Sequence, residues 1–104
     1  MSDVDFQSGG RIFEWDTEKN RLNKIKHGIN FKTAAKVFND DNRIERPDFE
    51  HSQDEERWQV IGLVDDVIFV VYTERGIKTR LISARLATDN ERSEYYGDGD
   101  IYFA

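Results

Sequence analysis

Cysteine is absent from the 104 residues, and proline occurs once. Without cysteine the chain has no disulfides and no thiolate ligands for a metal. Its two histidines, His27 and His51, are too few to build a structural zinc site by themselves. No apolar run approaches the ~20 residues of a membrane-spanning helix, and the N-terminus lacks the basic and apolar pattern of a signal peptide. These absences predict a cytoplasmic protein without a membrane span or a metal site.

Charge is plentiful but uneven along the chain. With 15 Lys+Arg and 21 Asp+Glu the formal net charge is −6, which argues mildly against a protein that simply coats nucleic acid. Residues 11–46, however, carry nine basic and six acidic residues, a local charge of +3. The N-terminal half could therefore hold a basic surface that the total hides. Seven Phe, four Tyr and two Trp are too many for a disordered chain, so a single domain over 1–104 is expected.

The first half of the chain predicts two helices. Residues 1–10 are expected to form a flexible leader ending in a glycine pair, followed by a short strand over 12–15. A helix is expected from the N-cap Asp16 to Gly28. Its apolar side chains recur at helical spacing, at Leu22, Ile25 and Ile29. Asn30 can cap a second, shorter helix with an apolar stripe formed by Phe31, Ala34, Ala35 and Phe38.

The second half predicts strands. Residues 43–48 are expected to form an edge strand because of Pro47, and residues 49–56 a polar loop. Three β-rich segments, 57–64, 67–74 and 77–84, predict an antiparallel meander. A capping box from Thr88 to Glu91 then opens a helix that ends near Tyr96, before an acidic tail over 97–104. The expected class is α+β, in the order β-α-α-β-β-β-β-α, with two N-terminal helices, a four-stranded antiparallel sheet and a C-terminal helix.

None of the common catalytic motifs is present, and none that binds a cofactor, so candidate sites rest on single side chains. Lys26 and His27 end the first helix; they are either a cationic pair for an anionic substrate, with His27 as general acid or base, or simple C-terminal caps. Glu50 and His51 could exchange protons with a ribose hydroxyl or a leaving group. Alternatively, they belong to a solvated loop with exposed ion pairs.

Three arginines in or beside the strands, Arg57, Arg80 and Arg85, could each clamp a phosphate or form a structural salt bridge. Strict alternation puts Arg80 and Arg85 on opposite faces, unless the strand has a bulge or ends after Ala84. Tyr95 could stack on a base, although core packing is the alternative.

The residue string resembles the BrnT toxin family from about residue 12 to residue 96. The matching blocks are Phe13-Glu14-Trp15-Asp16, Lys19-Asn20, Asn23, Lys26-His27-Gly28-Ile29, Phe31, Ala35, Val37-Phe38, His51-Ser52, Glu55-Glu56-Arg57-Trp58, Ile61-Gly62, Val71-Tyr72-Thr73-Glu74, Arg80-Leu81-Ile82-Ser83-Ala84-Arg85, Ala87-Thr88, Glu91-Arg92 and Tyr95. The resemblance implies a bacterial ribonuclease toxin of a type II toxin–antitoxin pair, which stops translation and has a RelE-like fold.

The resemblance also implies a partner, a BrnA-like ribbon-helix-helix antitoxin in a two-plus-two complex. Operator DNA would be contacted only through this antitoxin. Metal-free RNA cleavage needs a base at the 2′-hydroxyl, cations at the phosphate and an acid at the 5′-oxygen.

These requirements assign roles to the candidate residues. Glu50 or His51 would be the base, and Arg57 and Arg80 would stabilise the phosphoryl charge. RNA would be bound by Lys26, His27, Arg85 and Tyr95, with Lys26 or His27 also able to protonate the leaving group. Two alternatives stay open: a catalytically inactive toxin-fold module that acts as corepressor for the antitoxin, and an unrelated α+β scaffold with structural ion pairs.

Overall fold

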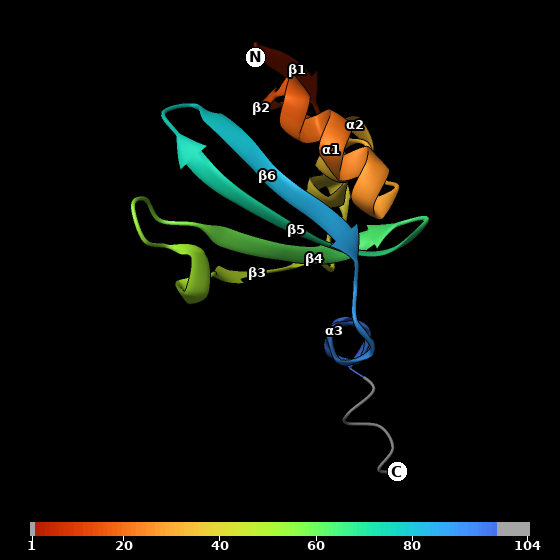
Figure 1. Cartoon of the computed structure of the whole chain (residues 1–104). Coiled ribbons are helices and arrows are strands. Elements are labelled where there is room, and N and C mark those ends of the chain that lie inside the picture. The colour runs from red at the N-terminus through yellow and green to blue at the C-terminus, as the bar shows by residue number, and fades with distance from the viewer. Residues whose placement is uncertain (1, 98–104) are drawn as a thin grey trace.

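Six strands form one mixed sheet, in the order β1-β2-β6-β5-β4-β3 (Figure 1). The computed structural model describes residues 2–97, apart from the side chain of His51. The strands are β1 (Asp3–Ser8), β2 (Arg11–Asp16), β3 (Ile44–Pro47), β4 (Trp58–Val64), β5 (Asp66–Arg75) and β6 (Lys78–Leu86). The helices are α1 (Thr17–His27), α2 (Phe31–Ala35) and α3 (Asp89–Tyr96), with 3₁₀ turns over Lys36–Asn39 and Phe49–His51. The α+β class is confirmed, but the sheet is larger than the expected four strands.

Residues 3–10, expected to belong to a flexible leader, form a strand and a tight turn. Residues Asp3–Ser8 form β1, which pairs antiparallel with β2 at the edge of the sheet. Gly9 and Gly10 both have positive φ, +59° and +80°, as a two-residue hairpin turn of type I′ requires. The sequence interpretation took this pair as a sign of flexibility, whereas it is the turn that joins two strands.

The sheet is mixed because β2 pairs parallel with β6, through the register from Ile12↔Lys78 to Glu14↔Arg80. The remaining pairs, β3 with β4, β4 with β5 and β5 with β6, are antiparallel, which confirms the predicted meander. The parallel pair joins segments more than sixty residues apart, so no local pattern could predict it. The prediction of a wholly antiparallel four-stranded sheet was therefore wrong.

Helix α1 has the expected ends but an unexpected buried face. Asp16 accepts a hydrogen bond from the Lys19 amide, and Gly28 closes the helix in the left-handed conformation. Leu22 and Ile25, expected to face the core, are 50% and 70% exposed. The buried residue of the helix is instead Asn23.

Asn23 takes the place of a strand beside β6. Among the described strands, none pairs with β6 on the β2 side beyond Arg80. There the Asn23 side-chain amide donates to the Ala84 carbonyl at 2.9 Å, and its oxygen accepts from the Ala84 amide at 3.1 Å. It also donates to the Ile29 carbonyl at 3.0 Å. Asn23 therefore attaches α1 to the part of β6 that has no described strand partner on this side.

The main core lies between one face of the sheet and helices α1 and α2. It includes Phe13, Trp15, Phe31, Val70 and Leu81, each at most 2% exposed. The opposite face carries a smaller buried cluster of Ile61, Val67, Phe69 and Val71. Tyr95 of α3 packs against this second cluster, and α3 lies on the side of the sheet away from α1 and α2 (Figure 1).

Helix α3 begins with the predicted capping box. The Thr88 hydroxyl accepts from the Glu91 amide, and the Glu91 carboxylate accepts from the Thr88 amide. Gly97 ends the helix in the left-handed conformation, and the rest of the predicted acidic tail lies outside the described residues. No helix within residues 2–97 is both long enough and apolar enough to cross a membrane.

Candidate functional site

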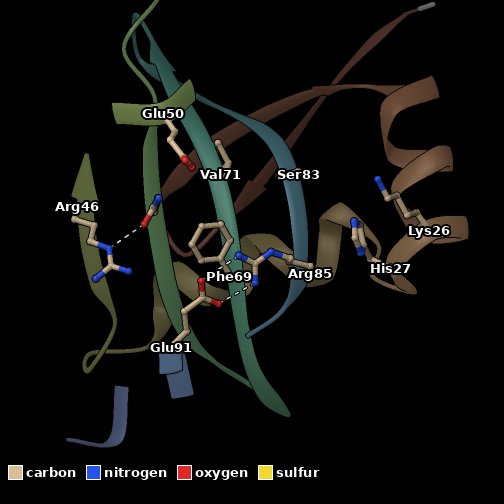
Figure 2. Close-up of a pocket in the computed structure, with 10 residues that line it drawn as sticks. Lys26, His27, Arg46, Glu50, Phe69, Val71, Ser83, Arg85 and Glu91 are labelled. Carbon is tan, nitrogen blue, oxygen red and sulfur yellow. Dashed lines mark hydrogen bonds and ion pairs between the residues drawn. The ribbon is translucent and has the colours of Figure 1, made fainter. Parts of the chain in front are cut away.

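An open pocket with a volume of about 490 Å³ lies on the sheet face that carries the smaller cluster. Its lining comes from α1, the 3₁₀ turn over Phe49–His51, four strands and α3 (Figure 2). The lining residues are Lys26, His27, Arg46, Glu50, Gln59, Phe69, Val71, Ser83, Arg85 and Glu91. Four of the eight site residues expected from the sequence therefore lie together: Lys26, His27, Glu50 and Arg85.

Strand pairing builds the floor of this pocket. Arg46 is opposite Gln59, Gln59 is opposite Val71, and Val71 is opposite Ser83, so these four form one row across β3, β4, β5 and β6. In a neighbouring row Phe69 is opposite Arg85. Side chains in one cross-strand row share a face of the sheet, so the pairing itself points these groups into the pocket.

A β-bulge decides which arginines share that face. The β5–β6 register changes from Val71↔Ser83 to Tyr72↔Leu81, leaving Ile82 as an extra residue on β6. Leu81 and Ala84, three residues apart, consequently both lie in the main core. Their neighbours Arg80 and Arg85 therefore both face the other side, in place of the opposite faces that strict alternation requires.

Arg85 is held by an aromatic ring and a carboxylate. Its guanidinium carbon lies 4.0 Å from the centre of the Phe69 ring, and its two terminal nitrogens donate to Glu91 at 2.8 and 3.0 Å. Burial acts to raise the pKa of Glu91, but the hydrogen bonds from Arg85 and the Thr88 amide outweigh it and hold this pKa below its ordinary value. Glu91 is therefore ionised at neutral pH and partly neutralises Arg85.

Arg46 is a pocket residue that the sequence analysis missed. Its Nε donates to Gln59 at 2.9 Å, and its two terminal nitrogens donate to Glu94 of α3 at 2.7 and 3.2 Å. The only local signal was the predicted edge strand over 43–48, in which every second side chain faces the same way. Without the register to Gln59, that alternation does not say which face holds the pocket.

Three titratable residues, Lys26, His27 and Glu50, lie on two sides of the pocket (Figure 2). Lys26 and His27 end α1, beside β6, whereas Glu50 lies in the 3₁₀ turn beyond β4. Val71 and Ser83 lie between them on the sheet floor. A polymer laid across the floor would thus have His27 on one side and Glu50 on the other.

Arg80 lies outside this pocket, although it faces the same side of the sheet. Its guanidinium donates to Asp3 at 3.1 and 3.2 Å and lies 3.2 Å from Glu14, with only 13% of the side chain exposed. The hydrogen bond from Arg80 lowers the pKa of Asp3. These contacts are those of a salt bridge that joins β6 to β1 and β2.

Arg57 and Tyr95 are also separate from the pocket. The Arg57 guanidinium is 3.8 Å from Glu55, and its buried Nε has no hydrogen-bond partner within the described part of the chain. Tyr95 donates to Asp40 at 2.6 Å, and this hydrogen bond raises the pKa of Tyr95 to about 12. His51 ends the 3₁₀ turn, and its side chain lies outside the described structure.

No metal-binding cluster is found in the described part of the chain. Among the side chains placed by the structure, no group of three or more His, Asp or Glu residues is arranged to hold a metal ion. The titratable side chains that line the pocket are two carboxylates, an imidazole, an amine and two guanidinium groups.

Comparison with known proteins agrees with this fold. The family model described as "Ribonuclease toxin, BrnT, of type II toxin-antitoxin system" matches residues 15–91, a span that contains every pocket-lining residue. The structure is similar to the crystal structure of the Brucella abortus ribonuclease toxin, BrnT, with a TM-score of 0.57 and 24% sequence identity. That match covers 72% of this chain and 94% of the Brucella chain, and shows a shared fold. No curated protein sequence matches the chain significantly.

Proposed function

The chain belongs to the BrnT family of ribonuclease toxins of type II toxin–antitoxin systems, and on that premise we propose that the sheet pocket is its RNA-cleaving site. The observation that carries the proposal is the placement of His27 and Glu50 on two sides of one pocket whose lining also includes Lys26, Arg46 and Arg85. Cleavage within an RNA chain needs both proton transfer and phosphate recognition. The pocket supplies groups for both.

The proposed reaction uses the 2′-hydroxyl of the RNA as nucleophile and needs no metal ion. A base removes the 2′-hydroxyl proton, O2′ bonds to the adjacent phosphorus, the bond from phosphorus to O5′ breaks, and an acid protonates O5′. The products are a 2′,3′-cyclic phosphate and a 5′-hydroxyl. We assign the base to Glu50 and the acid to His27, with Lys26 positioning the phosphate.

The guanidinium groups would stabilise charge on the phosphate in the transition state. Arg85 and Arg46 line the pocket, so they take this role in the proposal in preference to Arg57 and Arg80. The salt bridges of Arg80 to Asp3 and Glu14 support a structural role for that residue. His51, the next residue in the sequence after Glu50, is the alternative base.

Cleavage assays with matched variants test this assignment. Glu50→Gln and His27→Gln each remove a proton-transfer group, and we expect each to lower the cleavage rate by about 10²–10⁴-fold. Asp54→Asn removes an exposed carboxylate from the same loop, and Lys24→Ala removes an exposed cation from α1; both are expected to leave the rate unchanged. Thermal unfolding of each variant checks that it is folded.

Two results would overturn the assignment. Full activity in both Glu50→Gln and His27→Gln would place the chemistry elsewhere. Products with a 5′-phosphate, identified by mass spectrometry, would exclude attack by the 2′-hydroxyl.

Membership in a type II system implies an antitoxin partner. We propose that the partner is BrnA-like, with a ribbon-helix-helix part that binds operator DNA, and that two toxins and two antitoxins assemble. Co-expression with the candidate antitoxin should restore growth that the toxin alone arrests through inhibited translation. Native mass spectrometry should then give a two-plus-two mass; a one-plus-one mass would contradict the stoichiometry.

The alternative function is that of an inactive toxin-fold module acting as corepressor. It is favoured by one observation: Arg46, Arg80 and Arg85 each already have a carboxylate partner within the chain. A corepressor would neither cleave RNA nor arrest growth as a folded protein, but would tighten antitoxin binding to operator DNA. Parallel cleavage and DNA-binding assays separate the two functions.

A further inference from the structure

Helix α3 is attached to the sheet mainly through charged and polar side chains. None of its residues is buried. Its links are the ion pairs of Glu91 with Arg85, of Glu94 with Arg46 and of Arg92 with Asp66, together with the hydrogen bond from Tyr95 to Asp40. Tyr95 alone is packed against the smaller apolar cluster. A helix with so little apolar burial opens at low cost compared with the core.

Two of these links end on the arginines of the pocket. Glu91 and Glu94 are three residues apart, so both project from the same side of α3. Glu91 takes both terminal nitrogens of Arg85, and Glu94 takes both terminal nitrogens of Arg46. The two guanidinium groups that line the pocket are thereby both occupied by carboxylates of one short helix.

We propose that α3 is an autoinhibitory element, in which Glu91 and Glu94 occupy the guanidinium groups of Arg85 and Arg46. When α3 moves away, RNA phosphates bind these two groups instead. The inference rests on the proposed ribonuclease function. Carboxylate and phosphate both bind a guanidinium through two parallel hydrogen bonds, so each excludes the other from the same nitrogens. RNA binding then requires exchange of the two internal ion pairs for two phosphate contacts.

The surroundings of Arg85 support exchange in preference to a permanent salt bridge. The Phe69 ring, 4.0 Å away, holds the guanidinium in place independently of Glu91. When the carboxylate leaves, the arginine is still positioned over the pocket floor. Both guanidinium groups are also partly exposed, with 34% of the Arg85 side chain and 37% of the Arg46 side chain accessible, whereas Glu91 is only 14% accessible. An incoming phosphate can therefore reach both arginines and compete with the carboxylates for the same nitrogens.

The double variant Glu91→Gln/Glu94→Gln tests the proposal while preserving the helix. Glutamine at position 91 can still complete the capping box with Thr88, so α3 keeps its N-terminal hydrogen bonds. The matched control is Asp65→Asn/Asp89→Asn. It also removes two negative charges, one in the first turn of α3 and one in the β4–β5 turn beside Asp66, but neither aspartate is paired with an arginine in the described structure. Circular dichroism and thermal unfolding establish that both proteins are folded.

The measurement is binding of a fluorescent 2′-O-methylated oligouridine, which the enzyme cannot cleave, by anisotropy at several salt concentrations. We expect the Gln double variant to bind roughly three- to tenfold more tightly than the wild type. The slope of log affinity against log salt should steepen by about 0.7 for each additional phosphate that the protein binds. The control should bind like the wild type.

Hydrogen exchange of the wild-type protein gives a second test that needs no variant. Addition of the same oligonucleotide should accelerate exchange of the α3 amides, because phosphate releases the helix from both arginines. Slower or unchanged exchange in α3 with bound RNA would overturn the proposal.

The outcomes separate this inference from the proposed function. If the wild type binds or cleaves RNA and the Gln double variant does so equally well, autoinhibition is overturned, but the proposed function is not. Equal tightening in the control assigns the gain to net charge and also overturns it. Absence of RNA binding and cleavage in all three proteins overturns both.

Discussion

Asn23 offers the sharpest test of how the fold supports the pocket. Its side chain makes three hydrogen bonds, two with Ala84 of β6 and one with the Ile29 carbonyl, and it is only 7% exposed. Substitution by alanine removes all three. Because Ala84 is fully buried, water does not replace the lost partners, and its amide and carbonyl are left unsatisfied.

The expected cost follows from these contacts. Each hydrogen bond contributes roughly 0.5–1.5 kcal/mol net, and unsatisfied buried groups push the cost toward the upper end. The free energy of unfolding of Asn23→Ala should therefore fall by about 3 kcal/mol. For a domain of this size that corresponds to a melting temperature lower by roughly 10–20 °C. Asn23→Asp should cost at least as much at neutral pH, because a carboxylate then faces two carbonyl oxygens.

Urea denaturation of wild type, Asn23→Ala and Asn23→Asp measures these differences. Lys24→Ala, an exposed change on the same helix, is the control and should stay within about 0.5 kcal/mol of the wild type. If Asn23→Ala also stays within that margin, its amide does not act as a strand partner for β6. Because α1 ends in Lys26 and His27, the same variant should lower RNA cleavage even where it is still folded.

Two further predictions follow from other ion pairs and hydrogen bonds. Arg80→Met and Glu14→Gln should each lower the free energy of unfolding, because each single change leaves a partly buried charge without its partner. The double variant should therefore lose less free energy than the two single variants together. Additive losses in urea denaturation would refute the pairing. Tyr95→Phe should lower stability by about 1 kcal/mol through loss of the hydrogen bond to Asp40. Since that bond raises the pKa of Tyr95 to about 12 from 10.0, its contribution is present below pH 10 and lost as pH rises toward 12. Thermal melts of the wild type and Tyr95→Phe should therefore converge over that interval, and a constant difference would contradict the linkage.

Elements whose signals are local were predictable from the sequence. The Asp16 and Gly28 ends of α1, the Asn30 cap of α2 and the capping box of α3 depend on side chains within four residues of the backbone that they satisfy. The three-stranded meander was also readable, because its strands are joined by two short turns. In each of these elements the residues that determine the structure are neighbours in the chain.

Elements that depend on distant partners were not predictable. The helical spacing of Leu22 and Ile25 indicated an apolar face, yet both side chains are exposed. Helix α1 instead turns Asn23 inward, because its side chain satisfies the backbone amide and carbonyl of Ala84 at the edge of β6 that no described strand covers. The site shows the same limit. Lys26, His27, Glu50 and Arg85 were selected by residue type, but Arg46 enters only through its register with Gln59.

The acidic composition of the chain does not weigh against an RNA substrate. The pocket-lining side chains carry three permanent positive charges, Lys26, Arg46 and Arg85, and two carboxylates, Glu50 and Glu91, a local sum of +1 in a chain of net charge −6. At physiological salt, charges more than about 8 Å apart are largely screened at the surface. An RNA phosphate bound in the pocket, as we propose, would therefore respond chiefly to the local groups. Release of Glu91 would raise that local sum to +2, so the position of one helix changes the charge that RNA meets.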